Sequence, residues 1–313
     1  MLPAFPNFKK LELSDQADIK AITQKYPPYS DFNFVSMWSW DVKEEMRISE
    51  LNGNLVVRFT DYVTGEADYS FIGDNKTNET ASTLLNFCQE SKIKPILRLV
   101  PEISVKNLDP NIFSIQPDRD NFDYVIPAEI FIGNKSKLTK SKEKSIKRFL
   151  KKFEPIIKKL DVDDPGVKSS LLKLFAKWTH NKKNDPLEVR NELLAIERLI
   201  LGKCAKDHIC TGVFIEKELV SFCISQPLSN GYSTIHFCKA DTSLDSGTYA
   251  HVLKENATAL QQNGHQLINI EQDLGIESMR KWKMSHGDYI FLKKYKVRYN
   301  DKIPESKVNQ VLI

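Results

Sequence analysis

Residues 208–264 read "HICTGVFIEKELVSFCISQPLSNGYSTIHFCKADTSLDSGTYAHVLKENATALQQNG", and this stretch contains the pattern that decides the fold. It holds three runs rich in β-branched and aromatic residues, which predict strands over 208–215, 218–227 and 232–240. The stretch after Ser246 begins with a glycine and then has helical composition. Two apolar-periodic helices are predicted upstream of the three strands, over 166–180 and 186–204. A strand over 266–273, a helix over 276–285 and a strand over 289–297 are predicted downstream.

The first third of the chain has a looser form of the same order. Asn52-Gly53 stands between two β-favouring runs and predicts a hairpin. A strand, a helix, a strand and a pair of extended segments are predicted after it, over 67–73, 79–91, 95–100 and 113–128. We therefore expect an α+β protein with two tandem units, each a mostly antiparallel mixed sheet flanked by helices. Their expected bounds are 1–145 and 146–300, with a polar tail over 301–313.

The positive charge of the chain is concentrated in one segment. The net charge of the 313 residues is +4, but residues 135–159 hold eleven Lys or Arg against two Glu. Ile146, Phe149, Leu150 and Phe153 form one apolar helical stripe here. A second stripe is basic and consists of Lys140, Lys144, Lys147, Arg148 and Lys151. It predicts binding to the phosphates of a tRNA or to an anionic membrane surface, and a merely solvated lysine-rich face is the alternative.

Cysteine and histidine usage argues against a metal centre. The five cysteines are irregularly spaced without a CxxC, and the six histidines are scattered. We expect reduced thiols, no metal and a cytoplasmic location. No apolar run is long enough to span a bilayer and no signal peptide is recognisable, so any membrane contact is expected to be peripheral.

The stretch "NIEQDLGIESMRKWKMSH" (269–286) holds the candidate catalytic residues. If the strand continues to Asp273, then Asn269, Glu271 and Asp273 share a sheet face, where the two carboxylates can bind an ammonium group or act as a general base. Arg280 and Lys283 share a helix face and could stabilise an oxyanion or bind a phosphate. The structural alternative is a helix cap at Asp273 with surface ion pairs from Glu277.

These segments closely resemble a bacterial family related to the C-terminal catalytic domain of phosphatidylglycerol lysyltransferases. The resemblance extends from about residue 10 to 297, and "INIEQDLGIESMRKWKMSH" is its most specific part. It implies a tandem pair of GNAT-like folds and transfer of an aminoacyl group from aminoacyl-tRNA to an amine or hydroxyl acceptor. Two departures are notable: Cys238 stands in "HFCKA" where the family commonly has an acid, and the lysyltransferases' membrane-spanning region is not seen in this chain.

The resemblance also implies a donor-binding group of residues. Gly247 and Tyr249 are expected to line the cleft around the acyl donor, with Lys239 and Asn269 beside it. No further cofactor is required. The pyrophosphate-binding turn of acyl-CoA enzymes is matched only by Gly247, so acetyl-CoA is the less favoured donor. Two alternatives stay open: an acyl-CoA-dependent N-acetyltransferase, and a non-catalytic protein that binds a ligand, RNA or a membrane surface on the same fold.

Overall fold

The computed structural model describes residues 1–60, 66–133, 137–180, 186–202 and 207–300, without the side chains of 137–140, 180, 186 and 188. The polar tail that we expected over 301–313 lies outside the described residues. Two compact units make up the chain: the first contains 1–37, 43–122 and 292–313, and the second contains 38–42 and 123–291.

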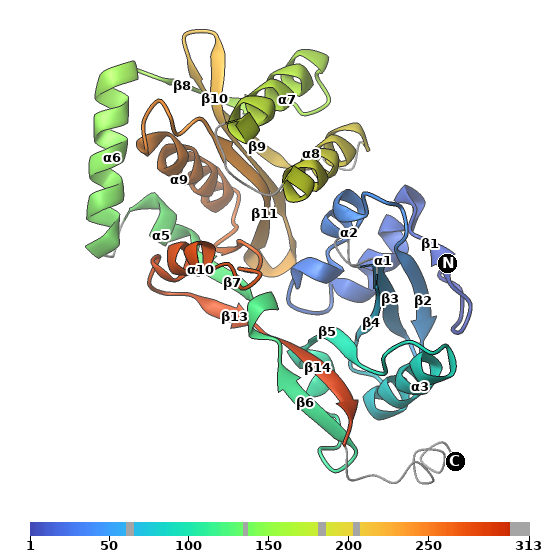
Figure 1. Cartoon of the computed structure of the whole chain (residues 1–313). Helices are drawn as coiled ribbons and strands as arrows, with labels where there is room; N and C mark the ends of the chain where they lie inside the picture. Colours follow the sequence, from blue (N-terminus) through green and yellow to red (C-terminus); the bar gives the residue numbers. More distant parts are fainter. Residues whose placement is uncertain (61–65, 134–136, 181–185, 203–206, 301–313) are drawn as a thin grey trace. The chain divides into compact units, whose positions relative to one another are not determined.

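The first unit is built on a mixed sheet (Figure 1). In spatial order its described strands are β1 (Lys9–Lys10), β2 (Arg47–Leu51), β3 (Asn54–Thr60), β4 (Ala67–Ile72), β5 (Leu97–Pro101), β14 (Lys294–Tyr299) and β6 (Phe113–Pro117). The helices that begin in this unit are α1 (Gln16–Thr23), α2 (Phe34–Trp40), α3 (Thr77–Glu90) and α4 (Glu102–Val105). The hairpin predicted at Asn52-Gly53 is confirmed, because both residues have positive φ (56° and 79°), as a type I′ turn requires.

The second unit has its own mixed sheet. In spatial order the described strands are β13 (Ile290–Leu292), β7 (Asp123–Pro127), β12 (Leu267–Asn269), β11 (Tyr232–Ala240), β10 (Glu218–Pro227), β9 (Ile209–Ile215) and β8 (Ile156–Leu160). The helices are α5 (Ala128–Ile132), α6 (Lys137–Phe153), α7 (Pro165–His180), α8 (Pro186–Leu201), α9 (Gly247–Gln262) and α10 (Glu277–Met284). β11 and β12 are parallel, whereas β8 to β11 form an antiparallel run.

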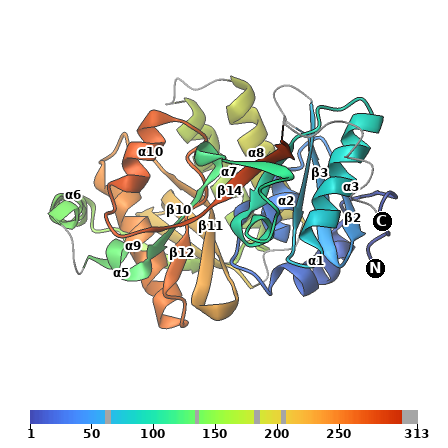
Figure 2. The ribbon, with the colours of Figure 1, turned by 90° about the horizontal axis from the view of Figure 1, so that it is seen from below.

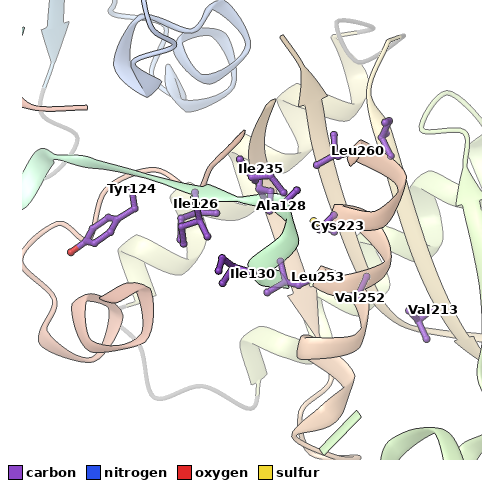
Figure 3. Packing of buried hydrophobic residues seen from close by; sticks show 14 of the residues in the cluster. Tyr124, Ile126, Ala128, Ile130, Val213, Cys223, Ile235, Val252, Leu253 and Leu260 are labelled. Carbon is purple, nitrogen blue, oxygen red and sulfur yellow. The ribbon is translucent and has the colours of Figure 1, made fainter. Parts of the chain in front are cut away.

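Helix α9 packs across the sheet of the second unit and closes its core. Figure 3 shows Val252, Leu253 and Leu260 of this helix beside strand residues such as Cys223 and Ile235. The buried Asn256 anchors the same helix, because its Oδ1 accepts from Ser225 Oγ at 2.5 Å and its Nδ2 donates to Thr211 Oγ1 at 3.1 Å. Helix α6 lies along α9 (Figures 1 and 2).

The bounds of the two units differ from the bounds 1–145 and 146–300 that we expected from the sequence. The extended pair predicted over 113–128 divides, so that β6 enters the first sheet and β7 the second. The single strand predicted over 289–297 divides in the same way into β13 and β14. Which sheet a strand joins depends on hydrogen-bonding partners distant in sequence, and local hydrophobic patterns do not identify them.

Candidate active site

The segment after β12 is a turn, and our expectation of a strand as far as Asp273 was wrong. The strand ends at Asn269, whose side-chain Oδ1 accepts from the backbone N–H of Glu271 at 2.7 Å. Glu271, Leu274 and Gly275 all have positive φ, at 61°, 54° and 75°. An extended strand cannot contain these angles. Asn269, Glu271 and Asp273 therefore do not lie along one strand face.

Asp273 holds this turn to its neighbours. Its carboxylate is fully buried and accepts from Tyr124 Oη at 2.6 Å and from the backbone N–H of Gly275 at 2.9 Å. Arg280 of α10 donates to both carboxylate oxygens, from Nε at 3.0 Å and from Nη2 at 2.8 Å. The arrangement is a bidentate charge-assisted pair, which is geometrically specific. Asp273 thus connects β7, the turn and α10.

Lys283 fixes the same turn from its other end. The residue is buried, and its ammonium donates to the carbonyl oxygens of Ile270, Glu271 (3.0 Å) and Gln272 (2.8 Å). Its Nζ also lies 5.7 Å from the centre of the Tyr124 ring. Three carbonyl acceptors match the three donors of an ammonium group and offset the cost of burying it. These contacts orient the main chain that carries Glu271.

Glu271 faces His236 at the point where β11 and β12 separate. The last paired residues of the two strands are Thr234 and Asn269. Two residues after each of these, His236 Nδ1 in β11 lies 3.9 Å from Glu271 Oε1 in the turn. The His236 side chain is buried, whereas that of Glu271 is 21% exposed. A carboxylate that solvent can reach therefore lies beside a buried imidazole.

The protonation of His236 follows from its surroundings. Burial, with a smaller contribution from the His208 ring 5.4 Å away, holds the pKa of His236 well below its usual range. The imidazole is therefore neutral near pH 7. Its Nε2 lies 3.2 Å from the Gln226 side-chain oxygen, which only accepts, so Nε2 carries the proton and Nδ1 holds a lone pair. The two atoms that face each other are thus both acceptors, and the pair suits a group that donates protons, such as an amine.

Sequence analysis did not select His236 as a candidate. Its place inside the predicted strand 232–240 suggested only that it is buried, which the structure confirms. Its relation to Glu271 depends on the register of β11 against β12, which no local pattern records. The one available signal was a titratable imidazole between the apolar residues Ile235 and Phe237 of the strand.

The expected donor-binding residues are not brought together. Lys239 forms an ion pair with Glu192 of α8, and its ammonium lies 3.9 Å from the Trp178 ring centre. Cys238, the next residue back along β11, points to the opposite face, because side chains alternate along a strand. That face packs on α9, where Tyr249 lies, and burial together with Cys238 raises the pKa of Tyr249 well above its usual range.

Gly247 allows two helices to approach closely. A Cβ atom at this position would lie 2.4 Å from the carbonyl oxygen of Ser145 and 2.9 Å from Phe149 Cβ, both in α6. The backbone N–H of Gly247 donates to Asp245 Oδ1 at 2.7 Å. The first turn of α9 is therefore covered by α6 and capped by an acidic side chain. This arrangement does not favour a pyrophosphate at that helix terminus.

The basic stripe divides into paired and unpaired residues. Arg148 donates to both oxygens of Asp245, at 2.8 Å each, and lowers the pKa of that carboxyl to about 2. Lys144, Lys147 and Lys151 are exposed and form no hydrogen bond or ion pair with the described part of the chain. The side chain of Lys140 lies outside the described residues. Three cations on one helix face therefore remain for a polyanion.

Among the residues that the structure describes, no cluster of three or more His, Cys, Asp or Glu side chains has the arrangement of a metal site. None of the described helices is both long enough and apolar enough to cross a membrane. The described cysteines are free thiols, and Cys204 lies outside the described residues.

The two mixed sheets with flanking helices have the fold of GNAT-like acyltransferases, present here in two units. The sequence identifies the family of this chain within that fold class. The chain belongs to the family described as phosphatidylglycerol lysyltransferase, C-terminal, whose model matches residues 23–298. A comparison with curated protein sequences gave no match.

Solved structures similar to this chain agree with the family. A conserved protein of unknown function from Bacteroides thetaiotaomicron shares 24% identity at a TM-score of 0.82, over 96% of this chain and 100% of that one. L-PGS from Bacillus licheniformis is similar at a TM-score of 0.63 with 10% identity, over 97% of both chains. A C-terminal domain from Agrobacterium fabrum, described as belonging to a lysylphosphatidylglycerol synthetase, gives a TM-score of 0.62 with 8% identity, over 96% and 95%.

Proposed function

We propose that this chain transfers an aminoacyl group from aminoacyl-tRNA to an amine or hydroxyl acceptor, at the Glu271–His236 pair. The observation that carries the proposal is the 3.9 Å separation of two proton-accepting groups where β11 and β12 part. A neutral imidazole and a carboxylate can both accept hydrogen bonds from an incoming amine. Family membership supports acyl transfer as the class of reaction.

The proposed reaction consists of the attack of the acceptor on the ester carbonyl and the departure of the tRNA. The acceptor nitrogen or oxygen attacks the ester carbonyl of the aminoacyl-tRNA, and Glu271 takes the proton that the acceptor loses. The tetrahedral intermediate collapses, the ester C–O bond breaks, and the 3′-terminal ribose oxygen of the tRNA leaves and takes up the proton that Glu271 holds. An amide or a new ester remains on the acceptor. Asp273, Arg280 and Lys283 act as positioning residues in this proposal, because their contacts hold the turn that presents Glu271.

The donor is inferred from helix α6 of the same unit. Lys144, Lys147 and Lys151 form an exposed cationic face on α6 that can neutralise tRNA phosphates without reading sequence. The same helix covers Gly247, which is where an acyl-CoA enzyme would bind pyrophosphate. Acetyl-CoA therefore has less support as the donor than aminoacyl-tRNA.

An acceptor at a membrane surface is supported by the residues around α10. Leu274, Ile276, Met284 and Ile290 are large apolar side chains that remain between 40% and 51% exposed. Exposed apolar groups suit a lipid surface, where they enter the interface.

The test is a transfer assay with tRNA charged with radiolabelled amino acids. The acceptors would be ethanolamine, glycerol and vesicles that contain phosphatidylglycerol. We expect label to leave the tRNA and enter one product, and Glu271→Gln to slow transfer by about 100-fold or more, the range for a lost general base. The matched control is Glu277→Gln, whose side chain is 79% exposed and which should keep the full rate.

Three outcomes would overturn the proposal. Full activity in Glu271→Gln would remove the assigned base. Binding of charged tRNA without transfer to any acceptor would favour a non-catalytic binding protein on this fold. Turnover of acetyl-CoA in place of aminoacyl-tRNA would favour the N-acetyltransferase alternative.

A further inference from the structure

A pocket apart from the Glu271–His236 pair lies in the second unit among helices α5, α6, α9 and α10. Most of its lining is apolar or aromatic, including Phe131, Ile146, Tyr249, Leu253 and Trp282. Its polar lining residues come from two helices and a turn: Lys142 and Glu143 from α6, Lys254 from α9, and His286 just after α10. Apolar walls with a few polar groups are typical of the lining of a small-molecule site, and the hollow that they enclose here has a volume of about 40 Å³.

The Lys142 ammonium interacts with a neutral partner in this pocket. Its Nζ lies 2.8 Å from His286 Nε2. The other ring nitrogen, Nδ1, lies 2.9 Å from the carbonyl oxygen of Trp282 and 3.1 Å from that of Lys283. Carbonyl oxygens only accept, so Nδ1 carries the proton and Nε2 accepts from Lys142. The imidazole therefore orients the lysine but supplies no negative charge.

The charge of Lys142 is poorly compensated. No carboxylate within the described part of the chain forms an ion pair with it, and its Nζ also lies 6.0 Å from the Trp282 ring centre. Burial lowers the pKa of Lys142 to about 8. Burial, followed by the nearby Lys142 charge, lowers the pKa of His286 to about 4. An anion bound beside Nζ would supply the counter-charge that the protein lacks at this point.

The charges around the pocket indicate the charge of the ligand. Lys142 and Lys254 are positive, Glu143 is negative and His286 is neutral at pH 7, which sums to one positive charge. A monoanion matches this sum better than a phosphate dianion does. The lysine offers single donors and not the planar fork with which arginine selects phosphate. The surrounding apolar walls require an apolar body on the ligand.

We propose that this pocket binds an apolar monocarboxylate, with its carboxylate on Lys142 Nζ and its apolar body against Trp282 and Phe131. The site is separate from the Glu271–His236 pair and does not depend on the aminoacyl-transfer proposal. Aromatic and aliphatic acids share the required chemistry. A comparison of the binding of an aromatic and an aliphatic acid shows which apolar body the pocket prefers.

Titration calorimetry on the full chain at pH 7 tests the proposal. The probes are 3-phenylpropionate, octanoate, the neutral isostere 3-phenylpropionamide and inorganic phosphate. We expect one acid or both to bind at a single site, and the amide to bind at least 10-fold more weakly. Lys142→Met should weaken acid binding by at least 10-fold, and Lys142→Arg should restore most of it. Lys152→Met is the matched control, because Lys152 is exposed on the same helix and its replacement should leave acid binding unchanged.

Three results would overturn the proposal. They are equal binding of the amide and the acid, unchanged acid binding in Lys142→Met, and tighter binding of phosphate than of either acid. Preferential binding of 3-phenylpropionate would identify an aromatic ligand, and preferential binding of octanoate would identify a fatty acid. A melting temperature of Lys142→Met close to that of the wild type shows that any loss of binding does not come from unfolding.

Discussion

The Asp273 carboxylate and the Arg280 guanidinium are joined by two hydrogen bonds, of 3.0 and 2.8 Å, and the carboxylate is fully buried. Arg280→Met would leave that carboxylate without its cation, although Tyr124 and Gly275 would still donate to it. We expect a loss of about 3–5 kcal/mol in the free energy of unfolding, the range for removing one partner of a buried ion pair. Urea denaturation measures it.

The control for this prediction is on the same helix. Lys281 pairs with Glu277, but both side chains are more than 70% exposed. Lys281→Met should change the free energy of unfolding by less than about 1 kcal/mol. Equal losses in the two variants would show that the Asp273–Arg280 pair does not hold the turn.

Gly247→Ala tests the contact between α6 and α9. The added methyl group would lie 2.4 Å from the Ser145 carbonyl oxygen, which is backbone and cannot rotate away. We expect a loss of about 1–3 kcal/mol in the free energy of unfolding, as for other overpacked sites. Calorimetric melting would show it, and an unchanged melting temperature would contradict the close approach of the two helices.

Stability should fall in acid because His286 is buried and neutral. Its pKa is about 4 in the folded chain, below the ordinary value of 6.5, so the unfolded chain binds a proton first as the pH falls. The free energy of unfolding therefore has its full value, as far as His286 is concerned, above pH 6.5. It falls by about 3 kcal/mol in total as the pH drops from 6.5 to 4. The free energy of unfolding of His286→Gln, measured by urea denaturation, should fall correspondingly less over that pH range. His236 and His251 remain in both proteins, so the difference between the two curves isolates His286.

The cationic face of α6 predicts salt-dependent tRNA binding. The slope of log association constant against log salt concentration is negative for such binding. The triple variant Lys144→Met, Lys147→Met, Lys151→Met should make this slope shallower by about two to three, because each lost phosphate contact contributes about 0.7–0.9. Filter binding at several salt concentrations measures the slope. The matched control neutralises the exposed lysines Lys43, Lys94 and Lys106 of the first unit and should leave the slope unchanged.

The apolar residues around α10 predict binding to anionic vesicles. Replacing Leu274 and Ile276 with serine should weaken co-sedimentation with phosphatidylglycerol vesicles by about 10-fold or more, since each side chain loses interfacial burial. Serine at the exposed Leu13 and Leu201 provides the control. Equal sedimentation of both double variants would argue against a membrane-facing α10.

Local patterns were enough for much of the fold. The Asn52-Gly53 hairpin, the strands β9 to β11 and helix α9 follow the predicted segments closely, because turn chemistry and apolar periodicity act within a few residues. The strand end at Asn269 was missed, since its cause is a side-chain hydrogen bond to the backbone of Glu271 that competes with extension of the strand.

The sequence by itself determined the family, the fold class and the candidate status of Glu271, Asp273, Arg280 and Lys283, because these residues stand together in one short stretch. Only the tertiary structure decided that β7 and β14 join different sheets, that Glu271 meets His236, and that α6 covers Gly247. The physical reason is the same in each case. Strand register and helix packing bring together residues that are distant along the chain, whereas propensity and periodicity describe only neighbours.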